Sequence, residues 1–151
     1  MKVKFEVLTS SEKERFLKKL KERFGFAGRL DYVFIKTKSG KIKIINPEVL
    51  KLNIKDLNVE NLGLYFARWD GDEVRLSIEG SQIVGKRATK NVLELTEDEA
   101  EKWLKGQNVE VGKRSVEDGF VILRFKDDFL GCGRYKDGRI VSFVPKWRRI
   151  H

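Results

Sequence analysis

Cysteine and histidine are almost missing from this 151-residue sequence, which contains one of each, Cys132 and His151. A single cysteine cannot form an internal disulfide, and such usage is typical of a reducing compartment, so we expect a cytoplasmic protein. The sequence has no CxxC pair and no Cys/His cluster of the kind that binds zinc. We therefore expect neither a metal ion nor any other cofactor.

Long apolar runs are missing as well. A membrane-spanning helix needs about 20 consecutive apolar residues, and no segment approaches that length. The first eight residues have few consecutive apolar side chains and no small-residue cleavage site, so they do not resemble a signal peptide. Two prolines and the lack of low-complexity tracts exclude a proline-rich linker. The sequence predicts a soluble chain with no membrane partner.

Acidic residues are the scarcer of the two charge types. The chain has 32 Lys and Arg against 23 Asp and Glu, a net charge of +9, and charged residues make up 36% of it, compared with about 25% in typical soluble proteins. Ion-pair networks like those of thermophilic proteins explain a high charge content but not an excess of cations. A field of this sign favours a polyanionic partner, nucleic acid ahead of an anionic membrane.

Residues 1–90 predict an antiparallel α/β unit. Residues 3–8 alternate between apolar and polar side chains, as in a strand, and Thr9–Ser11 offer N-caps for a helix that ends near Gly25. Paired short strands with glycine turns follow, which favours an antiparallel sheet without a βαβ crossover. These later elements are a hairpin of 32–36 with 42–45, a helical turn from Pro47 through Leu52, and a hairpin of 62–68 with 73–78.

Residues 91–151 predict a second, smaller unit. Thr96–Glu99 forms a capping box that opens a helix through Lys105. Short strands around one helix suggest a small barrel, so the predicted fold class is α+β with a boundary near residue 90. The remaining expected elements are a short helix within 80–90 and strands at 92–95, 120–125, 129–135 and 139–144.

Gly80–Arg87 fits the spacing G-x-x-x-x-G-K of a phosphate-binding loop. The eighth position of that motif needs a Ser or Thr hydroxyl for magnesium, but here it is Arg87, and the surrounding pattern is antiparallel. The alternative is a short helix capped by Ser81 that projects Lys86, Arg87 and Lys90 outward, where they can contact phosphates as point charges.

Residues suited to catalysis are few. His151 is the last residue of the sequence, and Cys132 lies between two glycines inside an apolar strand, which predicts a buried, unreactive thiol. The carboxylates of 97–101 are explained by helix capping and solvation. We therefore expect a protein that is not an enzyme.

The last 18 residues are strongly basic. Six cations accompany one acid, Asp137, and Tyr135, Phe143 and Trp147 are interleaved with them. Lys and Arg supply phosphate contacts, and an exposed aromatic ring can stack on an unpaired base. Trp147 could serve in this way or pack in the core. The predicted RNA-binding residues are Lys86, Arg87, Lys90, Arg134, Lys136, Arg139, Lys146, Trp147, Arg148 and Arg149.

Several short segments resemble known families. Residues 91–151 resemble a PUA domain, a small pseudo-barrel attached to many RNA-modifying enzymes, in Val92–Leu95, Lys105-Gly106, Gly119–Phe125 and Phe129–Arg134. The N-terminal part is similar to the pre-PUA domain of large-ribosomal-subunit biogenesis factors in Leu8–Glu12, Ile45–Leu50, Asn61–Leu64 and Arg75–Ile78. Val144–Arg149 is similar to the PUA-like tail of the Fmu/Sun-type rRNA 5-methylcytosine methyltransferases, although no methyltransferase domain is present.

These resemblances imply a pre-PUA domain at 1–90, available to a protein partner, and an RNA-binding PUA domain at 91–151. Lys146, Arg148 and Arg149 carry over from the family, whereas the other cations are inferred from charge. The leading hypothesis is a non-catalytic factor that binds ribosomal or pre-ribosomal RNA. A protein-interaction adaptor for an RNA methyltransferase or RNA-degrading complex is the alternative, and an RNA-modifying enzyme with an unrecognised catalytic carboxylate is a third.

Overall fold

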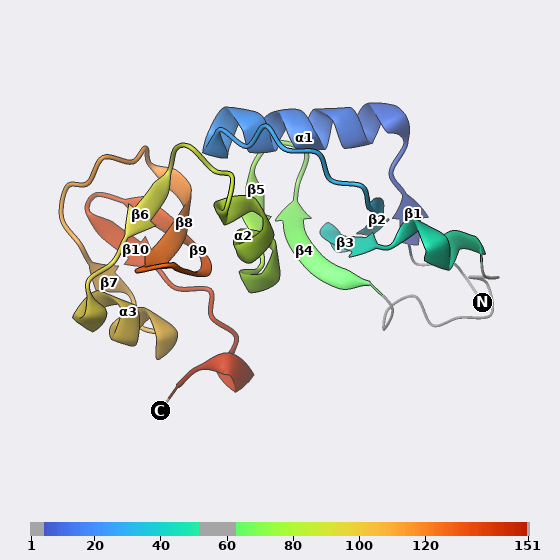
Figure 1. Cartoon of the computed structure of the whole chain (residues 1–151). Helices are drawn as coiled ribbons and strands as arrows, with labels where there is room; N and C mark the ends of the chain where they lie inside the picture. The colour runs from blue at the N-terminus through green and yellow to red at the C-terminus, as the bar shows by residue number, and fades with distance from the viewer. Residues whose placement is uncertain (1–4, 52–62, 151) are drawn as a thin grey trace.

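A computed structural model describes residues 5–51 and 63–150. In it, two five-stranded sheets lie on either side of a short central helix, α2 (Ile78–Gly85) (Figure 1). A long helix, α1 (Ser10–Phe24), covers the first sheet and reaches toward the second. The predicted α+β class is confirmed. None of the helices in the described ranges is long and apolar enough to span a membrane.

The first sheet is antiparallel throughout and has the strand order β1-β2-β3-β4-β5. The predicted helix, both hairpins and the helical turn are present, and the parts of these predictions at 3–4, 52 and 62 fall outside the described residues. The bounds are β1 (Phe5–Val7), β2 (Val33–Thr37), β3 (Lys41–Ile45), the 3-10 helix η1 (Pro47–Lys51), β4 (Leu64–Trp69) and β5 (Val74–Leu76).

Helix α1 begins and ends where its sequence predicts. The Thr9 hydroxyl accepts from the Glu12 amide at 3.1 Å, and the Glu12 carboxylate accepts from the Thr9 amide at 3.0 Å, so two otherwise unpaired amides are satisfied. Gly25 ends the helix in a left-handed conformation (φ 65°) that costs a glycine little. The buried face places Phe16 against Phe34 and Trp69, with ring centroids 5.6 and 5.4 Å apart.

The second sheet has the order β6-β8-β9-β10-β7, and only the β6–β8 pair is parallel. Helix α3 opens with the predicted capping box, in which Thr96 and Glu99 exchange hydrogen bonds. The bounds are β6 (Val92–Glu94), α3 (Glu97–Leu104), β7 (Val109–Glu110), β8 (Gly119–Phe125), β9 (Asp128–Lys136), β10 (Arg139–Val141) and the 3-10 helix η4 (Lys146–Arg148). The chain leaves the sheet after Val141, earlier than the predicted strand end at 144.

Both faces of the second sheet are buried. On β8, Ile122 faces the first sheet and α2, and it pairs in register with Cys132 of β9. Val121 and Leu123, on either side of Ile122, face the opposite way, into a core with Trp103 of α3. Because strand side chains alternate, one strand feeds two cores. The larger core therefore contains residues from both halves of the chain.

Hydrogen bonds fasten the connection near residue 90. The Thr89 amide donates to the Phe24 carbonyl at 2.8 Å, and the buried Asn91 donates from Nδ2 to the Arg23 carbonyl at 2.7 Å. Arg23 in turn donates from Nε to the Phe120 carbonyl at 2.7 Å. The two sheets separate at this point of the chain, but the domain division at residue 90 stays a prediction because the larger core extends across it.

The start and the cap of α2 differ from the prediction. The helix begins at Ile78, and its N-cap is Ser77, whose hydroxyl accepts from the Gly80 amide at 2.9 Å. Ser81, the predicted cap, is buried inside the helix and donates to the Ser77 carbonyl at 2.8 Å. Ser77 takes the cap because it has the extended backbone that a cap requires, directly after β5.

Candidate nucleic-acid interface

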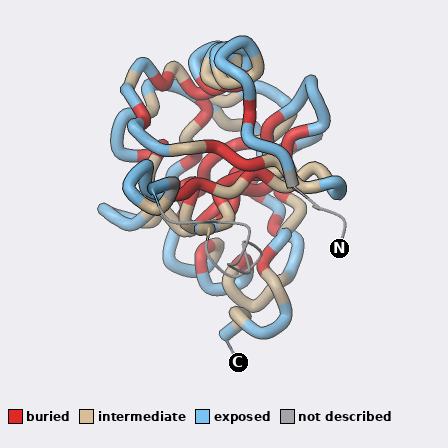
Figure 2. Tube along the Cα trace, turned by 90° about the vertical axis from the view of Figure 1, so that its right-hand side faces the viewer, coloured by how far each residue is buried: buried red, intermediate tan, exposed pale blue. Residues whose placement is uncertain are grey.

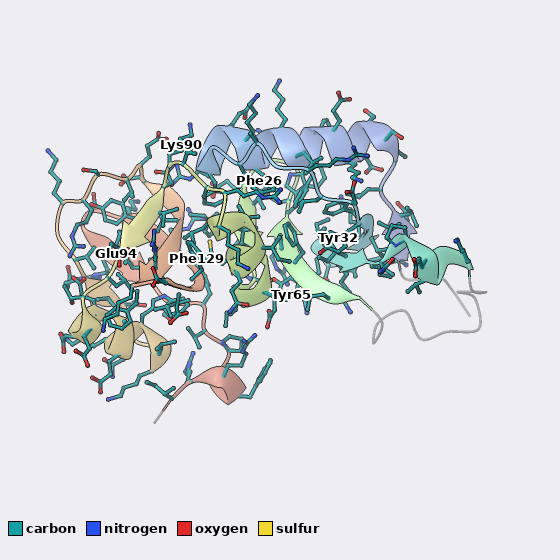
Figure 3. The ribbon with its side chains drawn as sticks, in the orientation of Figure 1. Phe26, Tyr32, Tyr65, Lys90, Glu94 and Phe129 are labelled. Carbon is teal, nitrogen blue, oxygen red and sulfur yellow. The ribbon has the colours of Figure 1, made fainter. Side chains whose placement is uncertain are left out.

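The segment that resembles a phosphate-binding loop is helical. Both motif glycines lie inside α2, where they permit close packing rather than a loop around phosphate. A Cβ at Gly80 would collide with the Phe66 carbonyl oxygen of β4, and a Cβ at Gly85 would collide with the Phe129 ring of β9. Figure 3 shows Phe129 between α2 and the second sheet. The motif therefore reflects helix packing, in agreement with the helical alternative.

A groove of about 480 Å³, which we call the α2–tail groove, lies between α2, the end of α3, the β8–β9 turn and the C-terminal segment. It brings together two of the predicted cations, Lys86 from α2 and Arg148 from η4. These residues are 62 positions apart in sequence (148 minus 86), so only the fold makes them neighbours. The other lining residues are Ile78, Gln82, Leu104, Asp127, Asp128, Phe129, Leu130 and Val144.

Specific contacts hold the C-terminal segment in place. The Arg148 guanidinium pairs with Glu79 of α2, and Arg149 donates from Nε to the Val144 carbonyl at 3.0 Å. The Ile150 amide donates to the Leu104 carbonyl at the end of α3, at 3.1 Å. The Arg149 side chain lies so close to Gly106 that a Cβ there would collide with it. The tail is docked on both α2 and α3.

Trp147 is 81% exposed, which excludes core packing and leaves the stacking alternative. The neighbouring Arg148 guanidinium lies 5.5 Å from the Trp147 ring centroid. Lys146, on the same turn, is exposed and forms no ion pair with another described residue. Figure 2 shows the C-terminal end mostly in the colours of exposed and intermediate residues. An aromatic ring flanked by cations therefore points into solvent.

A second surface feature alternates cations and aromatic rings, and we call it the cation–aromatic row. The Arg134 guanidinium lies 4.4 Å from the Phe120 ring centroid, and that ring lies 6.1 Å from Phe143. The Arg75 guanidinium of β5 lies 4.4 Å from the Phe143 ring centroid. Since Phe143 belongs to the row and Val144 to the α2–tail groove, the C-terminal segment joins the two features.

Several predicted cations are already paired with acids. Arg134 pairs with Glu73 at 3.2 Å, and Arg139 pairs with Glu110 at 2.6 Å. Exposed pairs of this kind contribute about 0–1 kcal/mol, so a phosphate can replace the carboxylate at little cost. Lys136 follows Arg134 on β9 and is exposed.

Arg87 and Lys90 lie apart from the groove. Arg87 is close enough to Gly28 that a Cβ there would meet its side chain, which places it at the loop after α1. Lys90 lies beside the end of α1, on the opposite side of the molecule from the tail (Figure 3). Proximity in sequence predicts one group of Lys86, Arg87 and Lys90, but the structure separates Lys86 from the other two.

Cys132 is the one cysteine of the chain and is buried, as predicted. Burial raises the pKa of its thiol to about 12, opposed by the Leu76 backbone hydrogen bond and nearby arginines. The thiol is therefore neutral near pH 7 and unsuited to nucleophilic attack. Within residues 5–51 and 63–150, no three His, Cys, Asp or Glu side chains form a group that could hold a metal ion.

A second hollow, of about 300 Å³, lies beside α1 and has mainly acidic lining. Its two cations, Lys19 and Arg23, are outnumbered by four acids, Glu22, Asp72, Glu73 and Asp118. Lys19 pairs with Asp72 at 3.5 Å, and Arg23 is engaged by backbone carbonyls. This surface is less suited to phosphate than the α2–tail groove.

Four further residues belong to these candidate surfaces although the sequence alone does not predict them, namely Arg75, Gln82, Phe120 and Phe129. Gln82 lies one helical turn before Lys86, and this spacing could have placed both on one face of α2. The partnership of Arg134 with Phe120 depends on the β8–β9 register, which no local pattern reveals.

Residues 90–150 match the family described as the methyltransferase RsmF PUA domain. No curated protein matches the chain. The matched segment contains all of the second sheet, α3 and the docked tail. The predicted likeness of the C-terminal part to a PUA domain, and to the tail of the Fmu/Sun-type methyltransferases, is confirmed. A PUA-like domain supports RNA binding, in agreement with the charge of the chain.

Proposed function

We propose that this protein is a non-catalytic RNA-binding factor that acts on ribosomal or pre-ribosomal RNA in ribosome biogenesis or rRNA modification. The observation that carries the proposal is that Lys86 and Arg148, from distant parts of the chain, line one groove beside the exposed Trp147. Cations for phosphates and an aromatic ring for a base are the two contacts that RNA recognition combines.

The ribosomal assignment rests on two resemblances. The matched domain is described as part of a methyltransferase, and the tail resembles that of rRNA methyltransferases. The N-terminal segments resemble the pre-PUA domain of ribosome biogenesis factors. A cytoplasmic location follows from this role and is supported by the lone cysteine.

The non-catalytic assignment is supported by the environment of the one cysteine. Its buried thiol has a pKa near 12 and cannot supply a thiolate at neutral pH. Three of the four acids of α3 are engaged by other residues. Glu99 caps the helix and pairs with Arg114 at 2.7 Å, Asp98 pairs with Lys102 at 3.0 Å, and Glu101 pairs with Lys105 at 3.0 Å.

The alternative is an adaptor that binds a protein through residues 1–80. Exposed apolar side chains in this part of the chain favour it, namely Val7, Tyr32 and Leu64. They lie on or beside different strands, whereas the cations of the groove converge.

Cross-linking in cells followed by sequencing of the bound RNA tests the proposal. Enrichment of ribosomal or precursor sequences is expected, and replacement of Lys86, Lys146 and Arg148 with Ala should reduce it. Recovery of protein partners without RNA would favour the adaptor. Incubation of purified protein with the recovered RNA fragment should leave the mass of that RNA unchanged, whereas a mass change would identify an enzyme.

A further inference from the structure

We propose that the α2–tail groove receives one unpaired nucleotide of the bound RNA, with its base against the apolar floor and its phosphates at Lys86 and Arg148. The inference rests on the proposed function and adds to it: the protein distinguishes RNA with an unpaired nucleotide from continuous duplex.

The lining of the groove suits a nucleotide better than a bare phosphate group. Its volume of about 480 Å³ is within the range of small-ligand sites, about 300–1,000 Å³. Ile78, Phe129 and Leu130 are partly exposed and give an apolar surface, which a base can cover and a phosphate cannot. A simple anion site would lack this surface.

The polar residues of the groove fit the other parts of a nucleotide. Gln82 offers an amide, with both donor and acceptor, for the edge of a base. Lys86 offers positive charge for one flanking phosphate. Arg148 uses Nη1 to bond Glu79, and its remaining N–H donors can bond a second phosphate. Asp127 and Asp128 also line the groove, so its cations are balanced by acids. This balance disfavours a polyphosphate or an anionic lipid surface, which would bring several negative charges at once.

Duplex RNA cannot use such a groove, because its bases are stacked and paired inside the helix. Proteins read RNA sequence mainly in loops and bulges, where an unstacked base can leave the helix. The exposed Trp147 immediately precedes Arg148. A base next to the inserted nucleotide can stack on this ring, which would hold the strand open at the rim of the groove.

The test compares three RNA hairpins of equal stem length by fluorescence anisotropy, each closed by a non-nucleotide linker so that no loop nucleotide is unpaired. One is fully paired, one has a single unpaired nucleotide, and one has an abasic site in place of that nucleotide. The wild-type protein should bind the second at least about tenfold more tightly than the other two, a difference of about 1.4 kcal/mol. The abasic hairpin keeps the phosphates and lacks the base, so it isolates base insertion.

Gln82→Trp fills the groove from an exposed position of α2 and should reduce the preference to less than about twofold. Ser11→Trp adds the same ring at an exposed position of α1 outside the groove and should change nothing. Lys86→Glu, which adds no bulk, should also weaken binding of the bulged hairpin, and melting curves check that each variant is folded.

Equal binding of the three hairpins by wild type, or a full preference in folded Gln82→Trp, would overturn the inference while leaving RNA binding intact. Failure of the wild-type protein to bind any hairpin would overturn the proposed function and the inference together.

Discussion

Replacing Trp147 with Ala removes a ring that is 81% exposed and belongs to none of the hydrophobic clusters formed by the described residues. Substitutions at such surface positions usually change the free energy of unfolding by less than about 0.5 kcal/mol. Stacking of a base on an aromatic side chain contributes about 1–3 kcal/mol. The affinity for RNA should therefore fall about 5- to 150-fold, while the melting temperature stays that of wild type.

The three tryptophans of the chain make this prediction measurable without a label. Trp69 and Trp103 are 2% and 1% exposed, so RNA should quench the fluorescence of Trp147 alone. Trp147→Ala should abolish the quenching, and Trp147→Phe should retain part of the affinity because a phenyl ring still stacks. Leu64→Ala is the matched control, since Leu64 is also an exposed apolar residue but lies on β4.

Two results would refute the reasoning. Wild-type affinity in Trp147→Ala would mean that no base stacks on this ring. A loss of unfolding free energy as large as the loss of binding free energy would mean that the ring stabilises the docked tail instead.

Three further predictions concern the charges and the thiol. Lys146→Ala and Arg149→Ala should each lower the salt slope of RNA binding by about 0.7–0.9. Only Arg149→Ala should also lower the melting temperature, because the Arg149 side chain bonds the Val144 carbonyl and packs against Gly106. Cys132→Ala should cost about 1 kcal/mol of stability without changing RNA affinity. Mass spectrometry should show that the native thiol resists iodoacetamide at about pH 8 until urea unfolds the chain. A hydrogen bond from the Thr9 amide lowers the pKa of the Glu12 carboxyl. The stabilisation by this carboxylate is therefore present at neutral pH and is lost as the pH falls through the lowered pKa. In melting curves, the higher stability of wild type relative to Glu12→Gln should vanish in acid.

Features set by neighbouring residues could be predicted from the sequence. The capping boxes at Thr9 and Thr96 and the hairpin turn at Asp70–Gly71 follow from side chains that bond to the backbone two or three residues away. Cys132 could be identified as buried because it stands in an apolar strand. Each of these needs no knowledge of the rest of the fold.

Features set by distant contacts could not be predicted. The glycines of α2 match a phosphate-loop spacing, and their actual role depends on Phe66 and Phe129, which are remote in sequence. Lys86 and Arg148 line one groove only because the tail returns to α2, where Glu79 pairs with Arg148. Arg87, one residue after Lys86, faces Gly28 instead. Proximity in sequence was therefore a poor guide to which cations share a surface.

We propose that RNA binds where α2 and the C-terminal segment meet. Filter binding over a salt series from about 50 to 200 mM tests it with two triple variants, each of which lowers the net charge from +9 to +6 by removing three cations. Lys86, Lys146 and Arg148 changed to Ala should weaken binding and reduce the salt slope by up to about three contacts, about 2–3 in log K per log unit of salt. The α1 variant, in which Lys18, Lys19 and Lys21 are changed to Ala, should have a smaller effect. Two acids, Glu14 and Glu22, lie within one helical turn of these lysines, and Lys19 already pairs with Asp72. If the α1 variant loses binding and the groove variant binds as wild type, the RNA surface lies on the N-terminal half and the claim is wrong.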